Sequence, residues 1–71
     1  MKEGSLVQLG SHYQGSVYDS EKGLRQKMYQ KGASGIVVSC EVRGPTPGAN
    51  VYLSSEKTVV WLPAEFLSIE N

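Results

Sequence analysis

The sequence predicts an all-β fold, a small five-stranded barrel with a long first loop and a short 3-10 turn before the last strand. Three observations predict it. Short runs of β-branched and aliphatic residues alternate with polar residues, which is the period-two pattern of half-buried strands. Eight glycines are spaced between these runs as turn signals rather than clustered as a linker. Near its end, a β-forming run over residues 58–62 stops at Pro63, and one tight turn leads into a short final strand.

The length of 71 residues predicts a single domain, residues 1–71, with a small core. Cys40 is the only cysteine, so no disulfide can form within the chain. One cysteine and one histidine are also too few to hold a zinc ion. Chains this short commonly gain stability by self-association, so a homo-oligomer is one of the expected states.

The first expected strand, residues 3–9, and the last, residues 67–70, each carry two aliphatic side chains on one face. Small barrels place their first and last strands side by side. The sequence therefore predicts one core from the aliphatic side chains of both strands. These side chains are Val7, Leu9, Leu67 and Ile69.

The clearest strand signal covers residues 36–42, where apolar and polar residues alternate. The predicted apolar face comprises Ile36, Val38, Cys40 and Val42. Because Cys40 shares this face with two valines, we expect it to pack in the core as a small hydrophobic residue. Burial in apolar surroundings would make its thiol inert rather than nucleophilic.

The next segments are a loop, a short strand, a turn and a longer strand. Residues 43–49 contain two prolines and two glycines, so we expect a loop rather than a central strand. Residues 51–53 form a short strand, and residues 54–57 form a polar turn. The chain returns from this turn along residues 58–62.

Residues 14–31 fit two structures. As a hairpin, two short strands would meet at a turn in which Gly23 takes the left-handed conformation. As a helix over residues 20–31, Ser20 would cap the start and Gly32 the end. Because a glycine costs about 1 kcal/mol inside a helix, a hairpin or an irregular loop is favoured and the helix stays as the alternative.

The charge and hydropathy patterns disfavour several classes of protein. Seven basic and seven acidic residues give a formal net charge of zero, whereas nucleic-acid-binding domains are typically basic. No apolar run approaches the roughly 20 residues that cross a bilayer. Residues 1–6 lack the apolar stretch of a secretion signal, and a single cysteine fits a reducing compartment. We therefore expect a cytoplasmic protein without a membrane partner.

The sequence offers no catalytic or metal-binding constellation. His12 has no carboxylate at a spacing that would orient it as a base. Residues 10–15 have the glycine spacing of a phosphate-binding loop but lack the Lys-Ser or Lys-Thr pair that should follow. The carboxylates are scattered, so none can be paired as acid and base. We expect a protein without catalytic activity, metal or cofactor, and keep an oligomeric enzyme with a shared pore site as a distant alternative.

Residues 59–62 are four consecutive apolar residues in one expected strand, so alternation sends two of them outward. The chain's own loop or a partner must cover the outward pair. Tryptophan is a favoured anchor of protein contacts. We therefore predict an adaptor-type site for another protein or a second copy of this chain. Its predicted residues are Trp61, Val59, Tyr52, Tyr13 and Phe66.

A cluster of basic residues supplies the alternative, a nucleic-acid-binding barrel. Basic side chains would contact phosphates while a neighbouring aromatic ring stacks on bases. The predicted residues are Lys22, Arg25, Lys27, Lys31 and Tyr29. Without a ligand, the same segment would be an ordinary solvated loop.

Three segments carry a resemblance to a known family: residues 4–9, the glycine-led residues 32–38, and residues 61–67. They resemble the Src-homology-3-like barrels over nearly the whole chain. The glycine–strand–glycine entry is similar to the KOW motif of ribosomal and transcription proteins. The closing part resembles the small barrel protein of photosystem I and the variable chain of ferredoxin–thioredoxin reductase. This resemblance implies an adaptor without chemistry of its own.

The end of the chain also looks like that of the type II dihydrofolate reductases. That family places a glutamine and a tyrosine in a Val-Gln-Ile-Tyr stretch, whereas residues 59–62 here read Val-Val-Trp-Leu. The reductase activity therefore does not carry over. The peptide-binding members of the barrel family use a tryptophan pair that this chain lacks, so binding of proline-rich peptides is not implied.

Overall fold

Seven strands and one 3-10 helix form the fold in the computed structural model, which describes residues 1–70 and confirms the all-β class. In chain order they are β1 (Leu6–Leu9), β2 (Tyr13–Asp19), β3 (Gly23–Tyr29), β4 (Ser34–Arg43), β5 (Thr46–Leu53), β6 (Thr58–Pro63), η1 (Ala64–Phe66) and β7 (Leu67–Ile69). Five strands form one antiparallel sheet in the order β6-β5-β4-β1-β7, and β2 pairs with β3 in a second sheet.

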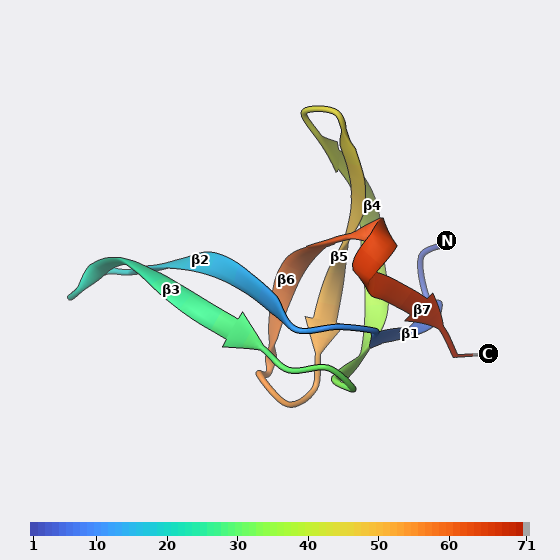
Figure 1. The fold of residues 1–71 in the computed structure, drawn as a ribbon, viewed down its shortest axis with the longest axis horizontal. Coiled ribbons are helices and arrows are strands. Elements are labelled where there is room, and N and C mark those ends of the chain that lie inside the picture. Colours follow the sequence, from blue (N-terminus) through green and yellow to red (C-terminus); the bar gives the residue numbers. More distant parts are fainter. Residues whose placement is uncertain (71) are drawn as a thin grey trace.

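The ambiguous segment is a hairpin, so the helix alternative is wrong. Strands β2 and β3 stay in register from Tyr13 opposite Tyr29 to Asp19 opposite Gly23. Gly23 has a φ of +77°, the left-handed conformation expected of it. Figure 1 shows this hairpin extending away from the five-stranded sheet.

The first and last strands lie side by side, as predicted. Val7 pairs with Ile69 and Leu9 with Leu67, and Figure 1 shows β1 and β7 together. Val7 and Leu9 are buried, and Leu67 packs partly against them. The prediction of a core position for Ile69 is wrong, because β7 is the outermost strand and leaves this side chain 53% exposed.

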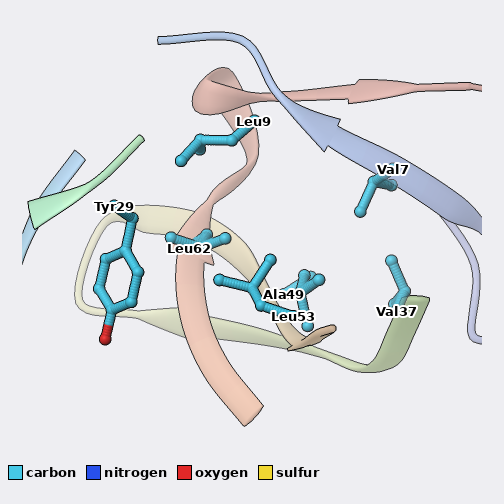
Figure 2. Packing of buried hydrophobic residues seen from close by; sticks show 8 residues of the cluster. Val7, Leu9, Tyr29, Val37, Ala49, Leu53 and Leu62 are labelled. Atoms are coloured by element: carbon cyan, nitrogen blue, oxygen red, sulfur yellow. The ribbon is translucent and has the colours of Figure 1, made fainter. Parts of the chain in front are cut away.

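The core gathers side chains from β1, β3, β4, β5 and β6 (Figure 2). Tyr29 enters it from the base of the hairpin, and Leu62 enters it from β6. The buried residues are Val7, Leu9, Tyr29, Val37, Ala49, Val51, Leu53 and Leu62.

The apolar face predicted for residues 36–42 points the wrong way. Val37 is 1% exposed and faces the core, while Ile36 is 46% exposed on the outer face. A β-bulge between Val37 and Ser39 shifts the register, so the strand does not keep one alternation along its length. Cys40 lies opposite the buried Ala49.

Cys40 itself is exposed, so its predicted core position is wrong. It belongs to the part of β4 that follows Val37, in which no side chain is buried. Its thiol donates a hydrogen bond of 3.4 Å to the carbonyl oxygen of Met1.

The expected loop over residues 43–49 is mostly strand, which corrects that prediction. Strands β4 and β5 pair as far as Arg43 opposite Thr46, around a turn in which Gly44 has a φ of +59°. Pro47 is tolerated because β6 ends opposite Gly48. Within residues 1–70, β5 has a neighbour on one side only beyond that point, where a missing N–H need not break a ladder.

The short 3-10 turn before the last strand is confirmed as η1. The Gly10 N–H donates a hydrogen bond of 2.8 Å to the Phe66 carbonyl oxygen, so the end of β1 is tied to this turn. Within residues 1–70, no helix combines the length and apolar character that a membrane crossing requires.

Candidate functional site

A cleft of about 540 Å³ lies between β2 of the hairpin and β6 of the sheet, and we call it the hairpin–β6 cleft. Its long walls are residues 15–18 and residues 58–61, with Tyr13, Tyr29 and Arg43 completing the lining. Each wall contributes consecutive residues rather than every second one. Because alternate side chains of a strand point to opposite faces, consecutive residues meet at a strand edge. The cleft is therefore bordered by two strand edges.

Trp61 lines this cleft, and its indole ring has a fixed orientation. Its indole Nε1–H donates a hydrogen bond of 2.9 Å to the Glu41 carbonyl oxygen. A Cβ atom at Gly48 would lie 2.5 Å from the Trp61 Cζ2 atom, so only glycine lets the indole lie so close to β5. Trp61 is half-buried as a result.

The Arg43 side chain lies over the Trp61 indole and belongs to a hydrogen-bonded cluster with the Glu41 and Asn50 side chains. The Arg43 Cζ atom lies 5.0 Å from the centre of the Trp61 ring, within the range of a cation–π interaction. Arg43 Nε donates a hydrogen bond of 2.6 Å to Glu41 Oε2. Asn50 Nδ2 donates one of 3.2 Å to Glu41 Oε1. The hydrogen bond from Arg43, and then that from Asn50, lower the pKa of Glu41 below its ordinary value of 4.5.

Acid is expected to loosen this cluster and change the fluorescence of Trp61, the only tryptophan. The pKa of Glu41 is lower in the folded than in the unfolded chain. Its stabilising contribution is therefore complete above the unfolded pKa and is lost as the pH falls through the folded one. Tryptophan emission recorded from pH 7 downward should show a transition below pH 4.5. The Glu41→Gln variant should lack that transition. Identical titration curves for the variant and the wild type would contradict the expectation.

Two tyrosines of the cleft lining, Tyr13 and Tyr29, belong to a cluster of aromatic rings. The Tyr13 and Tyr29 rings are stacked with centroids 6.5 Å apart, and Tyr13 meets Phe66 edge-on at 5.3 Å. A Cβ atom at Gly15 would lie 3.2 Å from the Tyr13 ring, so the ring covers the backbone of β2 closely. Burial raises the pKa of Tyr29. These contacts anchor the base of the hairpin to the core.

The structure brings together part of the predicted protein-binding set. Trp61, Val59 and Tyr13 line the cleft together. Tyr52 pairs with Val59 across the strands but lies on the outer face of the sheet, and Phe66 packs behind Tyr13. The prediction that Val59 and Trp61 point outward while their neighbours turn inward is confirmed, because Leu62 is buried and Val60 packs against the core.

Tyr52 belongs to a row of exposed apolar side chains that crosses four strands in register. The pairs are Leu6 with Ile36, Ile36 with Tyr52, and Tyr52 with Val59. Each of these side chains is 40–48% exposed. A smaller hollow of about 240 Å³ is lined by Leu6, Ile36 and Tyr52 of this row. Strand pairing therefore gives the outer face of the sheet a continuous apolar strip.

The basic residues of the alternative site lie along the hairpin and just beyond it. Lys27 forms an ion pair with Glu56 from the β5–β6 turn. The Lys31 N–H donates a hydrogen bond of 3.1 Å to His12 Nδ1, which gives that imidazole a structural partner. Lys22 and Arg25 lie at the hairpin turn and on β3. Tyr29 is only 5% exposed, so its ring cannot stack on a base. The predicted stacking role of Tyr29 is therefore wrong.

The sequence did not point to Arg43 and residues 15–18 as part of one site with Trp61. The predicted hairpin included residues 15–18 but assigned them to no site. Among residues 1–70, no group of three His, Cys, Asp or Glu side chains could hold a metal ion.

Comparison of the chain with protein-family models, curated proteins and solved structures finds no match in any of the three. A function for the cleft is therefore inferred from its geometry alone.

Proposed function

We propose that the chain is a non-enzymatic protein-binding domain of the cytoplasm and that the hairpin–β6 cleft is its binding site. One observation carries the proposal: the cleft presents tryptophan, tyrosine and arginine side chains along two strand edges. These three residue types dominate the energetic centres of protein interfaces.

The fixed orientation of Trp61 supports this function. Its ring is held by the Glu41 carbonyl oxygen, by the Arg43 guanidinium and by close contact with Gly48. A side chain that is already ordered loses little conformational entropy when a partner arrives. Trp61 is therefore suited to anchor a protein ligand.

The polar groups of the cleft support binding rather than catalysis. Among the described residues of its lining, Arg43 is the only charged side chain, and none carries a carboxylate or an imidazole. The Glu41 carboxylate beside Arg43 already accepts hydrogen bonds from Arg43 and Asn50. General acid–base chemistry needs such a group within hydrogen-bond reach of a substrate. The resemblance of the sequence to adaptor-type barrels points in the same direction.

The proposal predicts that peptides selected on this domain depend on Trp61. A library of random 12-residue peptides would be selected on the wild-type protein, and the affinity of the enriched peptides would be measured by fluorescence polarisation. Trp61→Ala should weaken their binding at least tenfold, because the anchor is lost. A thermal melt of the variant would establish that it is folded.

Tyr52→Ala is the matched control, because it removes an exposed aromatic ring outside the cleft. It should change the affinity by less than threefold. Failure to enrich any peptide, or equal binding by the folded Trp61→Ala variant, would end the proposal. If only Tyr52→Ala weakens peptide binding, the binding site would instead be the apolar strip on the outer face of the sheet.

A further inference from the structure

The edge of β6 that borders the cleft is open and lacks the features that usually block strand addition. Within residues 1–70, strand β6 pairs with β5 on one side only. Residues 58–62 contain neither proline nor a charged side chain. Natural proteins usually protect an exposed edge with lysine, proline, a bulge or a covering element. An unprotected edge is a template for another strand.

The edge of β2 across the cleft is open in the same way. In the described part of the chain, strand β2 pairs only with β3, and residues 15–18 line the opposite wall. Four residues of extended chain span about 13 Å, so each wall offers a similar length of backbone. The two edges border a single cleft of about 540 Å³.

We propose that the protein ligand binds as an extended peptide segment that adds one strand between β6 and β2, with its backbone paired to both edges. This inference rests on the proposed function and specifies its ligand. Main-chain hydrogen bonds would supply affinity, and side chains at alternate positions would supply specificity. The added strand would join the five-stranded sheet and the hairpin into one continuous sheet.

The two-edged geometry favours a flexible peptide over a second folded copy of this chain. An edge strand of a folded copy is already paired on one side, so it could pair with β6 or with β2 but not with both. It would also carry its own sheet into the cleft. A free peptide in an extended conformation has both edges available.

The alternation of side chains along a strand determines which peptide sequences fit the cleft. One row of peptide side chains would lie on the core side, next to Val60 and Tyr13, which both pack against the core. The other row would lie on the outer side, next to Val59 and Trp61. Apolar residues at every second position are therefore expected in the segment, with the core-facing row the more strictly apolar.

N-methylation of selected peptides tests the pairing. Successive N–H groups of a strand point to opposite edges, so methylating odd positions blocks one edge and methylating even positions blocks the other. Methylation of the odd positions and methylation of the even positions should each weaken peptide binding at least tenfold. Methylation of peptide residues that lie outside the cleft should have little effect. If only one set weakens binding, or neither does, two-sided strand addition is overturned. Binding that still depends on Trp61 would leave the proposed function intact.

Amide hydrogen exchange on the peptide complex gives an independent readout. Alternate amides of residues 15–18 and of residues 58–61 should exchange at least tenfold more slowly when the peptide is bound. If the amide exchange rates of residues 15–18 or of residues 58–61 do not change when the peptide binds, the inference is overturned. Light scattering should show one copy of the chain per complex. A doubled mass that falls on addition of peptide would instead assign the cleft to a second copy.

Discussion

Replacing Leu62 with alanine is expected to leave most of the protein unfolded at 25 °C. The Leu62 side chain is 0% exposed and packs among the core residues shown in Figure 2. Truncating a buried leucine to alanine costs about 2–5 kcal/mol, because apolar contacts are lost and a cavity remains. A core of this size rarely supplies more than about 3–5 kcal/mol of net stability. The substitution therefore removes most of the free energy of unfolding.

Leu24→Ala is the matched control for this prediction. Leu24 is 72% exposed on the hairpin, so the same chemical change should alter the free energy of unfolding by less than about 0.5 kcal/mol. Urea denaturation followed by circular dichroism measures both variants. If Leu62→Ala unfolds at the same urea concentration as the wild type, the described core is wrong.

Replacing Gly35 with alanine is the second large effect expected. A Cβ atom there would lie 2.5 Å from the Tyr52 carbonyl oxygen and 2.6 Å from Val51 Cγ1. The carbonyl belongs to the backbone of β5, which cannot move away without disturbing its pairing with β4. Overpacking of this kind typically costs about 1–3 kcal/mol. In a domain of this size each kcal/mol lowers the melting temperature by roughly 4–8 °C.

Gly10→Ala provides the comparison for Gly35→Ala in thermal melts. Its Cβ atom would meet the Ser68 Oγ atom at 3.5 Å, an ordinary van der Waals distance. The melting temperature should therefore fall much less than in Gly35→Ala. Equal losses in the two variants would contradict the close approach of β4 and β5 at Gly35.

The features that sequence predicted correctly are those with a local cause. The left-handed Gly23 marked the hairpin, and Pro63 marked the end of β6 before the 3-10 turn. Alternation over residues 59–62 separated the outward Val59 and Trp61 from their inward neighbours. Each of these signals lies within a few residues of the structure that it specifies.

The features that sequence missed depend on distant parts of the chain. The bulge at Val38 reversed the alternation of β4, and no residue there is one that bulges require. Pro47 could stay in a strand only because β6 ends opposite Gly48. Tyr13, which lines the cleft, packs against Phe66, which lies far along the chain. Such contacts come from tertiary packing, which a reading of local patterns does not include.

The close contact of Gly48 with the Trp61 indole makes two positions on neighbouring strands depend on each other. Any side chain at position 48 would displace the ring, and its Cβ atom would also lie 2.6 Å from the Leu62 carbonyl oxygen, so the indole is one of two reasons for the glycine. Homologous sequences that keep the tryptophan at position 61 should therefore keep glycine at position 48. A larger residue at position 48 would mark a lineage that has abandoned the tryptophan anchor.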